Sequence, residues 1–181
     1  MKVLIIYADG FEDVEALATR DVLVRAKIDV IDAKINEDNE IVTSSHNLSI
    51  KGFKSLNNID VNDFDAIILP GGSRGVNNLL KSDKVISLLK EFHNKNKLVC
   101  AICAAPMVLN KAGLLKEKRF TCYPGCEKGL EGIYTGEEVV ILDKMITARS
   151  MLYSIPFGLA IIEKLLGKEV RDTIYRQIAG L

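Results

Sequence analysis

Two pairs of cysteines are the residues whose spacing most directly suggests chemistry. Cys100 and Cys103 lie three positions apart in KLVCAICAAP, and Cys122 and Cys126 lie four positions apart in TCYPGC. Such pairs can hold zinc, form a redox pair or supply one nucleophile. Zinc-binding pairs usually occupy a tight turn that points both sulfurs the same way, and no glycine or turn former separates Cys100 from Cys103. We therefore expect no metal here.

Cys100 and Cys103 differ in their surroundings. Cys100 lies inside the apolar segment LVCAI, and we expect it to be a small buried hydrophobic residue. A thioredoxin-like pair would need both cysteines at a helix start. Cys103 lies where this segment ends and a helix is expected to begin, a position that favours an anion. The position predicts a nucleophile whose thiol pKa is lowered from about 8.5 to roughly 3.5–7.5. A second packed cysteine is the alternative.

Glu15 is expected to face Cys103 from the first helix. The first helix has a stripe predicted to be buried that consists of Val14, Leu17, Ala18, Val22 and Leu23. Glu15 follows the first apolar segment and shares this stripe with Ala18 and Val22. Burial raises the pKa of a carboxyl group, so a protonated Glu15 would donate a hydrogen bond to a Cys103 thiolate. The alternative is an ion pair at the helix surface.

A proline followed by two glycines, at 70–72, offers unobstructed backbone N–H groups near the same point. Glycine pairs usually indicate only a turn. Beside a nucleophile, the amides of this loop, at Gly71 and Gly72, together with Ala104 would form an oxyanion-type site. In particular, we expect Gly72 N–H and Ala104 N–H to hold the oxygen of an adduct.

The elements that must position these residues alternate between apolar strands and amphipathic helices. Strands are expected at 2–7, 28–35, 65–70, 97–102, 137–143 and 144–149, with a hairpin from 40–45 and 48–52. Helices are expected at 12–27, at 76–94 with a break near Ser82, and at 104–113, 154–166 and 169–178. This order indicates a mostly parallel sheet covered on both faces, with ligands beyond the carboxyl ends of the strands. The loops DGFEDVE and PGGSRG and Cys103 should converge there.

Composition limits the classes of partner. The chain has 181 residues, enough for one domain, and its 24 Lys and Arg balance its 24 Asp and Glu. This balance predicts neither nucleic-acid nor membrane binding. The first apolar run is too short for a signal peptide or a membrane span. With four cysteines, we expect reduced thiols in a cytoplasmic setting.

The segments DGFEDVE, ILPGG, AICAAP, TAR and LLGKEV, in this order, resemble the ThiJ/PfpI superfamily, and within it the branch of the human parkinsonism-associated deglycase. The resemblance covers nearly the whole chain. It implies one domain at 1–181, an α/β, flavodoxin-like three-layer sandwich with a mostly parallel central sheet, and a homodimer. It also implies a reactive Cys103, a protonated partner at Glu15, amides at Gly72 and Ala104, and no cofactor.

The resemblance implies a cysteine-dependent glyoxalase or deglycase that acts on small 2-oxoaldehydes or their protein adducts. The alternative is a redox-sensing or chaperone protein whose Cys103 is oxidised to a sulfinate. A protease, an amidase or a thiazole monophosphate biosynthesis protein is disfavoured. Many relatives place a histidine in the segment TCYPG where this chain has Tyr123, which we expect to be a pocket residue, so a Cys–His dyad lacks its base. After Arg149 the chain reads SMLYS where that branch has a glycine- and proline-rich turn. The resemblance therefore does not predict the shape of the entrance to the site.

Overall fold

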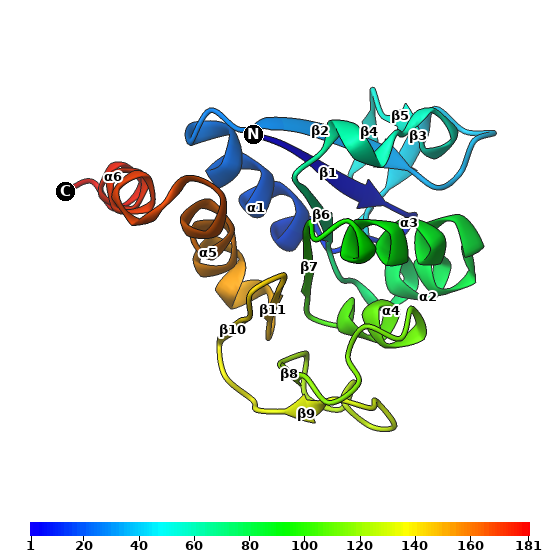
Figure 1. Cartoon of the computed structure of the whole chain (residues 1–181). Helices are drawn as coiled ribbons and strands as arrows, with labels where there is room; N and C mark the ends of the chain where they lie inside the picture. Colours follow the sequence, from blue (N-terminus) through cyan, green and yellow to red (C-terminus); the bar gives the residue numbers. More distant parts are fainter.

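A seven-stranded sheet runs through the centre of the computed structural model, which describes residues 1–181 (Figure 1). In spatial order its strands are β10 (Val139–Ile141), β11 (Met145–Ala148), β7 (Leu98–Ile102), β6 (Ala66–Leu69), β1 (Lys2–Tyr7), β2 (Asp29–Lys34) and β5 (Lys54–Ser55). Neighbours pair in parallel except β10 and β11, which are antiparallel. The predicted mostly parallel α/β sheet is confirmed.

Helices cover both faces of the sheet (Figure 1). One layer contains α1 (Asp13–Arg25), α5 (Ser154–Leu166) and α6 (Lys168–Ala179), and the other contains α2 (Ser73–Lys81), α3 (Asp83–Asn94) and α4 (Pro106–Lys111). Each layer closes a separate apolar core. Along β1, Leu4 and Ile6 belong to one core while Val3 and Ile5 belong to the other, because successive side chains of a strand point to opposite faces. This is why the central strands are apolar throughout.

Short elements complete the chain. The predicted hairpin is confirmed as β3 (Ile41–Thr43) paired with β4 (Ser49–Lys51) in antiparallel register. A second small sheet pairs β8 (Arg119–Phe120) with β9 (Ile133–Tyr134), and three 3₁₀ turns occur at η1 (Leu56–Asn58), η2 (Val61–Asp63) and η3 (Met151–Tyr153). Strands β5, β8 and β9 were not predicted, because two-residue segments are too short to show periodicity.

The break predicted near Ser82 is confirmed between α2 and α3. The Ser82 side chain accepts a hydrogen bond from Val85 N–H and so caps α3. Helix α2 begins at Ser73, three residues before the predicted start at 76, because Gly72 lies at a φ of +90° and ends the preceding loop.

The buried face of α1 differs from the prediction. Val14 and Leu17, expected on the buried stripe, are 45% and 36% exposed. Polar contacts orient the helix instead: Glu15 accepts a hydrogen bond from Gly71 N–H, and the Thr19 hydroxyl donates to the backbone oxygen of Ser154 at the start of α5. Apolar periodicity was therefore right for the second half of α1, where Val22 and Leu23 are buried, and wrong for its first turns.

The strand order reverses between β1 and β6, so the loops that follow β1, β6 and β7 meet at one edge of the sheet. Two backbone hydrogen bonds join the first two loops, from Gly75 N–H to Gly10 O at 3.0 Å and from Glu12 N–H to Gly71 O at 3.0 Å. The predicted convergence of DGFEDVE, PGGSRG and Cys103 at this edge is thus observed.

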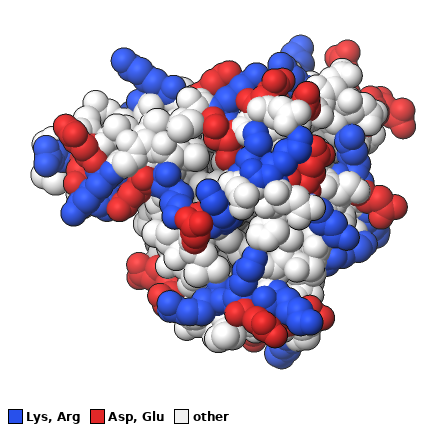
Figure 2. Space-filling model, viewed as in Figure 1, with Lys and Arg blue, Asp and Glu red and all other residues white.

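The surface carries both signs of charge in alternation on the face shown in Figure 2. None of the helices combines the length and the apolar character needed to cross a bilayer.

Candidate active site at Cys103

Cys103 directly follows β7 and has a positive φ of 64°. Its N–H donates to Ala148 O at 2.9 Å, and its carbonyl oxygen accepts from Tyr123 N–H at 2.8 Å. A positive φ at a residue with a side chain costs roughly 1–3 kcal/mol and persists where the surroundings fix it. The contacts with β11 and the 121–126 loop supply that constraint, and they hold the half-buried thiol at the bend between strand and helix.

Glu15 lies beside Cys103 in the interior. Its side chain is only 1% exposed, and Oε2 accepts a hydrogen bond from Gly71 N–H at 2.8 Å. The carboxyl group and the Cys103 side chain approach the same point beside Gly71, and Cys103 lowers the pKa of the carboxyl group. Burial raises the pKa of Glu15 to about 7, and the nearby charge of Glu12 adds to the increase, while the hydrogen bonds from Cys103 and Gly71 oppose it. The structure therefore brings together the two residues expected to meet.

The two glycines have different tasks. A Cβ on Gly71 would lie 2.5 Å from Glu15 Oε2 and 2.8 Å from Cys103 Cβ, so only glycine fits between them. A Cβ on Gly72 would lie 2.3 Å from Gly10 O. The Gly71 N–H, included in the expected oxyanion-type set, is instead used to hold Glu15.

The backbone amides of Gly72 and Ala104 lower the pKa of the Cys103 thiol. These are the two N–H groups that the sequence suggested for the oxygen of an adduct. In the structure they favour a negative charge on the sulfur itself. A carbonyl oxygen bonded to the carbon that the sulfur attacks would lie close to the same donors.

The predicted lowering of the Cys103 pKa is wrong. Burial raises the pKa of this thiol, and the charge and hydrogen bond of Glu15 raise it further, whereas the Ala104 and Gly72 amides lower it. Helix α4 begins only at Pro106 and has six residues, so the helix start that was expected to stabilise a thiolate does not follow Cys103 directly. Cys103 and Glu15 are best described as one coupled pair in which burial favours the protonated forms.

A cavity of about 500 Å³ opens beside the Cys103 thiol. Its lining consists of Ser73, Val76, Asn77, Cys103, Ala104, Met107, Tyr123, Pro124 and Cys126. Tyr123, predicted as a pocket residue, is among them and is 51% exposed. Val76 and Met107 were not singled out from the sequence, whereas Cys126 was considered there as one of a cysteine pair. Only Met107 carried a signal, since it lies on the helix that was predicted to follow Cys103.

A tight turn forms one wall of this cavity. Cys126 N–H donates to Tyr123 O at 2.9 Å, with Pro124 and Gly125 between them and Gly125 at a φ of +97°. Proline followed by a residue with positive φ is typical of a type II turn. Because Tyr123 N–H also donates to Cys103 O, the turn is tied to the backbone of the reactive residue.

The other cysteines do not gather around one point. Cys100 is fully buried in the core beneath α1 and α5, as predicted, whereas Cys122 is fully buried in the core on the opposite face of the sheet. Their sulfurs are separated by the sheet, so the zinc-like spacing of the four cysteines does not correspond to a four-sulfur site.

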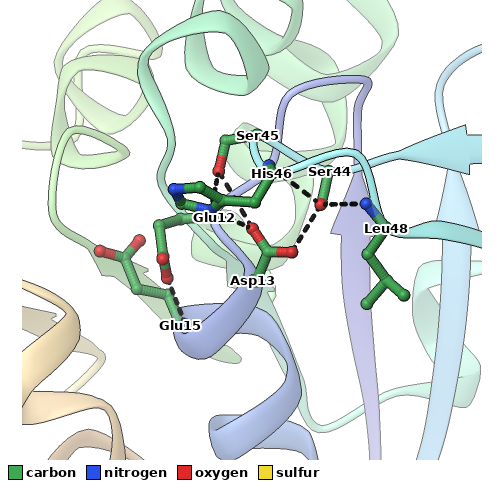
Figure 3. A network of polar contacts seen from close by, with 7 residues as sticks. All are labelled: Glu12, Asp13, Glu15, Ser44, Ser45, His46 and Leu48. Atoms are coloured by element: carbon green, nitrogen blue, oxygen red, sulfur yellow. Dashed lines mark hydrogen bonds and ion pairs between the residues drawn. The ribbon is translucent and has the colours of Figure 1, made fainter.

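A polar network ties the β3–β4 hairpin to the start of α1 (Figure 3). Asp13 accepts from the Ser44 hydroxyl at 2.5 Å and the Ser45 hydroxyl at 3.1 Å, and its Oδ2 lies 2.8 Å from His46 Nδ1. Although burial raises the pKa of Asp13, these hydrogen bonds lower it overall. The Glu15 carboxyl points away from this network (Figure 3). The network therefore fixes the loop that precedes Glu15 and takes no part in the Cys103 site.

Fold and site together define a flavodoxin-like α/β protein in which a cysteine at a strand end contacts a buried glutamate. The chain belongs to the DJ-1/PfpI family, which its residues 1–164 match. The resemblance seen in the sequence is thereby confirmed.

Similar proteins agree with this assignment. Protein dj-1beta of Drosophila melanogaster is 37% identical over 169 residues, which is 92% of this chain and 90% of the fly protein. The crystal structure of Drosophila DJ-1beta superposes with a TM-score of 0.93 at 35% identity and covers 98% of this chain and 97% of that one. Protein DJ-1 homolog B of Arabidopsis thaliana is 36% identical over 93% of this chain, which spans only 39% of the plant protein.

Two relatives have names that state an activity. A deglycase of Pyrococcus abyssi is 30% identical over 152 residues, 82% of this chain and 90% of the archaeal protein. A glutathione-independent glyoxalase of Caenorhabditis elegans is 34% identical over 170 residues, 92% of this chain and 89% of the nematode protein.

Proposed function

We propose that the chain is a cofactor-independent glyoxalase or deglycase that acts on small 2-oxoaldehydes or their protein adducts. The observation that carries this proposal is the adjacent Cys103–Glu15 pair, with a cavity beside the sulfur. The Gly72 and Ala104 amides favour a negative charge on that sulfur. The names of the archaeal and nematode relatives support the same chemistry. A cytoplasmic location, where thiols stay reduced, fits the four free cysteines.

The first step is addition of Cys103 to the aldehyde carbon. As the carbon–sulfur bond forms, the thiol proton passes to the Glu15 carboxylate, and the carbonyl oxygen gains the negative charge beside the Gly72 and Ala104 amides. Glu15 then returns the proton to that oxygen to give a hemithioacetal. A carboxyl group whose pKa is about 7 can both accept and donate a proton at neutral pH.

The second stage moves hydrogen between the two substrate carbons. Glu15 removes the proton from the carbon bonded to sulfur and delivers it to the oxygen of the neighbouring carbon, which gives an enediol. It then takes the proton of the hydroxyl group on the sulfur-bearing carbon and delivers it to the neighbouring carbon, which gives the thioester of a 2-hydroxy acid. Water then cleaves the carbon–sulfur bond, releases the hydroxy acid and restores the thiol. The internal oxidation and reduction balance, so no redox cofactor is consumed.

The test is methylglyoxal turnover by the wild-type protein and by Cys103→Ser and Glu15→Gln. We expect each variant to lose at least about 100-fold in kcat/KM, since a nucleophile or proton-transfer group contributes that much or more. Cys126→Ser, which alters a cavity residue outside the pair, is the matched control. Equal rates for wild type and all variants would rule out the proposal.

A redox sensor is the second candidate, because Cys103 and Cys126 line the same cavity. A hydroperoxide would oxidise Cys103 to a sulfenic acid with loss of an alcohol or water, and further to a sulfinate. Intact-mass measurement after brief peroxide treatment separates the outcomes. Gain of two oxygens at Cys103 with negligible methylglyoxal consumption would favour the sensor, and loss of two hydrogens would indicate a disulfide.

A further inference from the structure

We propose that the cavity beside Cys103 selects 2-oxoaldehydes with an uncharged apolar substituent, such as an aryl group, and rejects those with an anionic substituent. This inference rests on the proposed function and adds the substrate class. It is carried by the composition of the cavity wall and by the position of one residue, Met107.

The wall of the cavity has no charged side chain. Six of its nine residues are hydrophobic, and the two polar ones from α2, Ser73 and Asn77, are neutral. A carboxylate or phosphate that entered this space would lose hydration and find no cationic partner. An apolar substituent would instead gain from the removal of its surface from water. The wall therefore discriminates by charge.

The cavity is also larger than methylglyoxal requires. Its volume of about 500 Å³ lies within the range of sites that enclose drug-sized ligands. The space extends from Cys103 between α2 and α4, which pack against each other, towards the turn at 123–126. An aldehyde carbon at the sulfur thus leaves room for a ring on the other side of the keto group.

Met107 is the side chain placed to contact that ring. It lies in the first turn of α4, is half-buried, and packs against the core on this face of the sheet. Val76 of α2 also lines the cavity and is only 1% exposed, so this part of the wall is fixed. An unbranched thioether adapts its shape to a ligand and makes favourable contacts with aromatic rings. We infer that Met107 determines substrate specificity.

The experiment compares kcat/KM of the wild-type protein for three aldehydes: phenylglyoxal, 4-methoxyphenylglyoxal and 4-carboxyphenylglyoxal. The methoxy compound matches the carboxylate closely in size and lacks its charge. We expect both neutral compounds to exceed the carboxylate by about tenfold or more, the discrimination typical of a binding pocket. Cys103→Ser, measured in parallel, gives the rate at which the aldehydes are consumed by other residues, and this rate is subtracted.

Met107→Lys tests the specificity residue. It should raise kcat/KM for the carboxylate about tenfold and lower it for phenylglyoxal, whereas Met107→Leu should keep the wild-type order. Ile141→Lys, at an apolar residue of β10 that is 50% exposed and does not line the cavity, is the matched control and should change neither. If Met107→Lys does not fold, the wild-type comparison still decides the charge discrimination.

The outcomes separate the two proposals. Cys103-dependent turnover with equal rates for the methoxy and carboxy compounds would overturn this inference and leave the proposed function standing. Consumption of all three aldehydes that is unaffected by Cys103→Ser would overturn both. A Met107→Lys variant that folds and keeps the wild-type order would remove Met107 from the specificity role.

Discussion

A buried carboxyl group beside a half-buried thiol is the residue-scale feature on which the chemistry depends. Neither Glu15 nor Cys103 is in an environment that favours its charged form, and the protein offers three backbone amides as compensation. Glu15 takes one of them, from Gly71, and the sulfur takes the other two. The pair therefore holds a proton that is easily transferred, which is the property that the proposed mechanism uses.

The raised pKa of Glu15 predicts a pH-dependent stability. Because its folded-state pKa of about 7 exceeds its ordinary value of 4.5, the folded state binds the proton more tightly. This contribution is fully present below pH 4.5 and is lost as the pH rises through 7. The loss is about 3 kcal/mol for a shift of this size. Glu15→Gln cannot ionise, so it should exceed wild type in free energy of unfolding at pH 8.

Urea denaturation at pH 5 and pH 8 measures this difference. The gain of Glu15→Gln over wild type should be small at pH 5 and reach about 1–3 kcal/mol at pH 8. Glu131→Gln, which alters an exposed glutamate, should show no such dependence. A gain that is the same at both pH values would mean that the Glu15 pKa is not raised by folding.

Glu15→Gln should also change the reactivity of the Cys103 thiol. The charge of Glu15 raises the pKa of Cys103, so Glu15→Gln should increase the thiolate fraction and speed the reaction of Cys103 with iodoacetamide at pH 8. The rate is followed by intact mass, with Cys103→Ser to identify the modified residue. Slower alkylation would instead support the original sequence-based hypothesis, in which a protonated Glu15 stabilises a thiolate.

Residue types and their order were enough to find Glu15, Cys103 and the PGG loop, because each follows a recognisable apolar strand. They were not enough to predict the direction in which the pKa of the Cys103 thiol is shifted, because that direction depends on burial by elements distant in the sequence. Val76 was also missed. Its contribution to the cavity comes only from the way that α2 packs, and an apolar side chain has no chemical signature of its own.

At the scale of elements, α1 shows where periodicity misleads. The prediction placed Val14 and Leu17 in the core, but both are exposed, while Glu15 and Thr19 are buried. The helices after β6 and β7 were located well because caps and prolines mark their ends. On α1, the buried face is set by contacts with Gly71 and with α5, which the local sequence does not contain.

The exposed apolar face of α1 supports the proposed homodimer. Leu152 and Ile155, near the start of α5, are 76% and 44% exposed, and Ile155 lines a hollow with Ala18 of α1. Apolar side chains on adjacent helices form a surface that a second copy would cover. Leu17→Glu should therefore convert a dimer to a monomer in analytical ultracentrifugation, and Ile141→Glu, at the sheet edge, should not. A wild-type protein that sediments as a monomer would refute the homodimer.

At the scale of the whole molecule, one sheet supports two cores. Alternate side chains of β1 enter opposite cores, so the same strand carries packing on both faces. The single domain at 1–181 remains a prediction, and this shared strand gives it a physical basis. Each layer of helices is stabilised by packing against the sheet, and the sheet is stabilised by both layers. Neither layer should therefore unfold alone.

This coupling predicts one cooperative transition. Ile5→Ala removes a side chain from the core beneath α1 and α5, and it should lower the free energy of unfolding by about 2–5 kcal/mol. Because β1 also holds Leu4 and Ile6 in the other core, α3 on the opposite face should lose hydrogen-exchange protection to the same extent as α5. Hydrogen exchange followed by mass spectrometry in mild denaturant resolves the two helices. Loss of protection in α5 alone would show that the layers unfold independently and that the chain is not one cooperative domain.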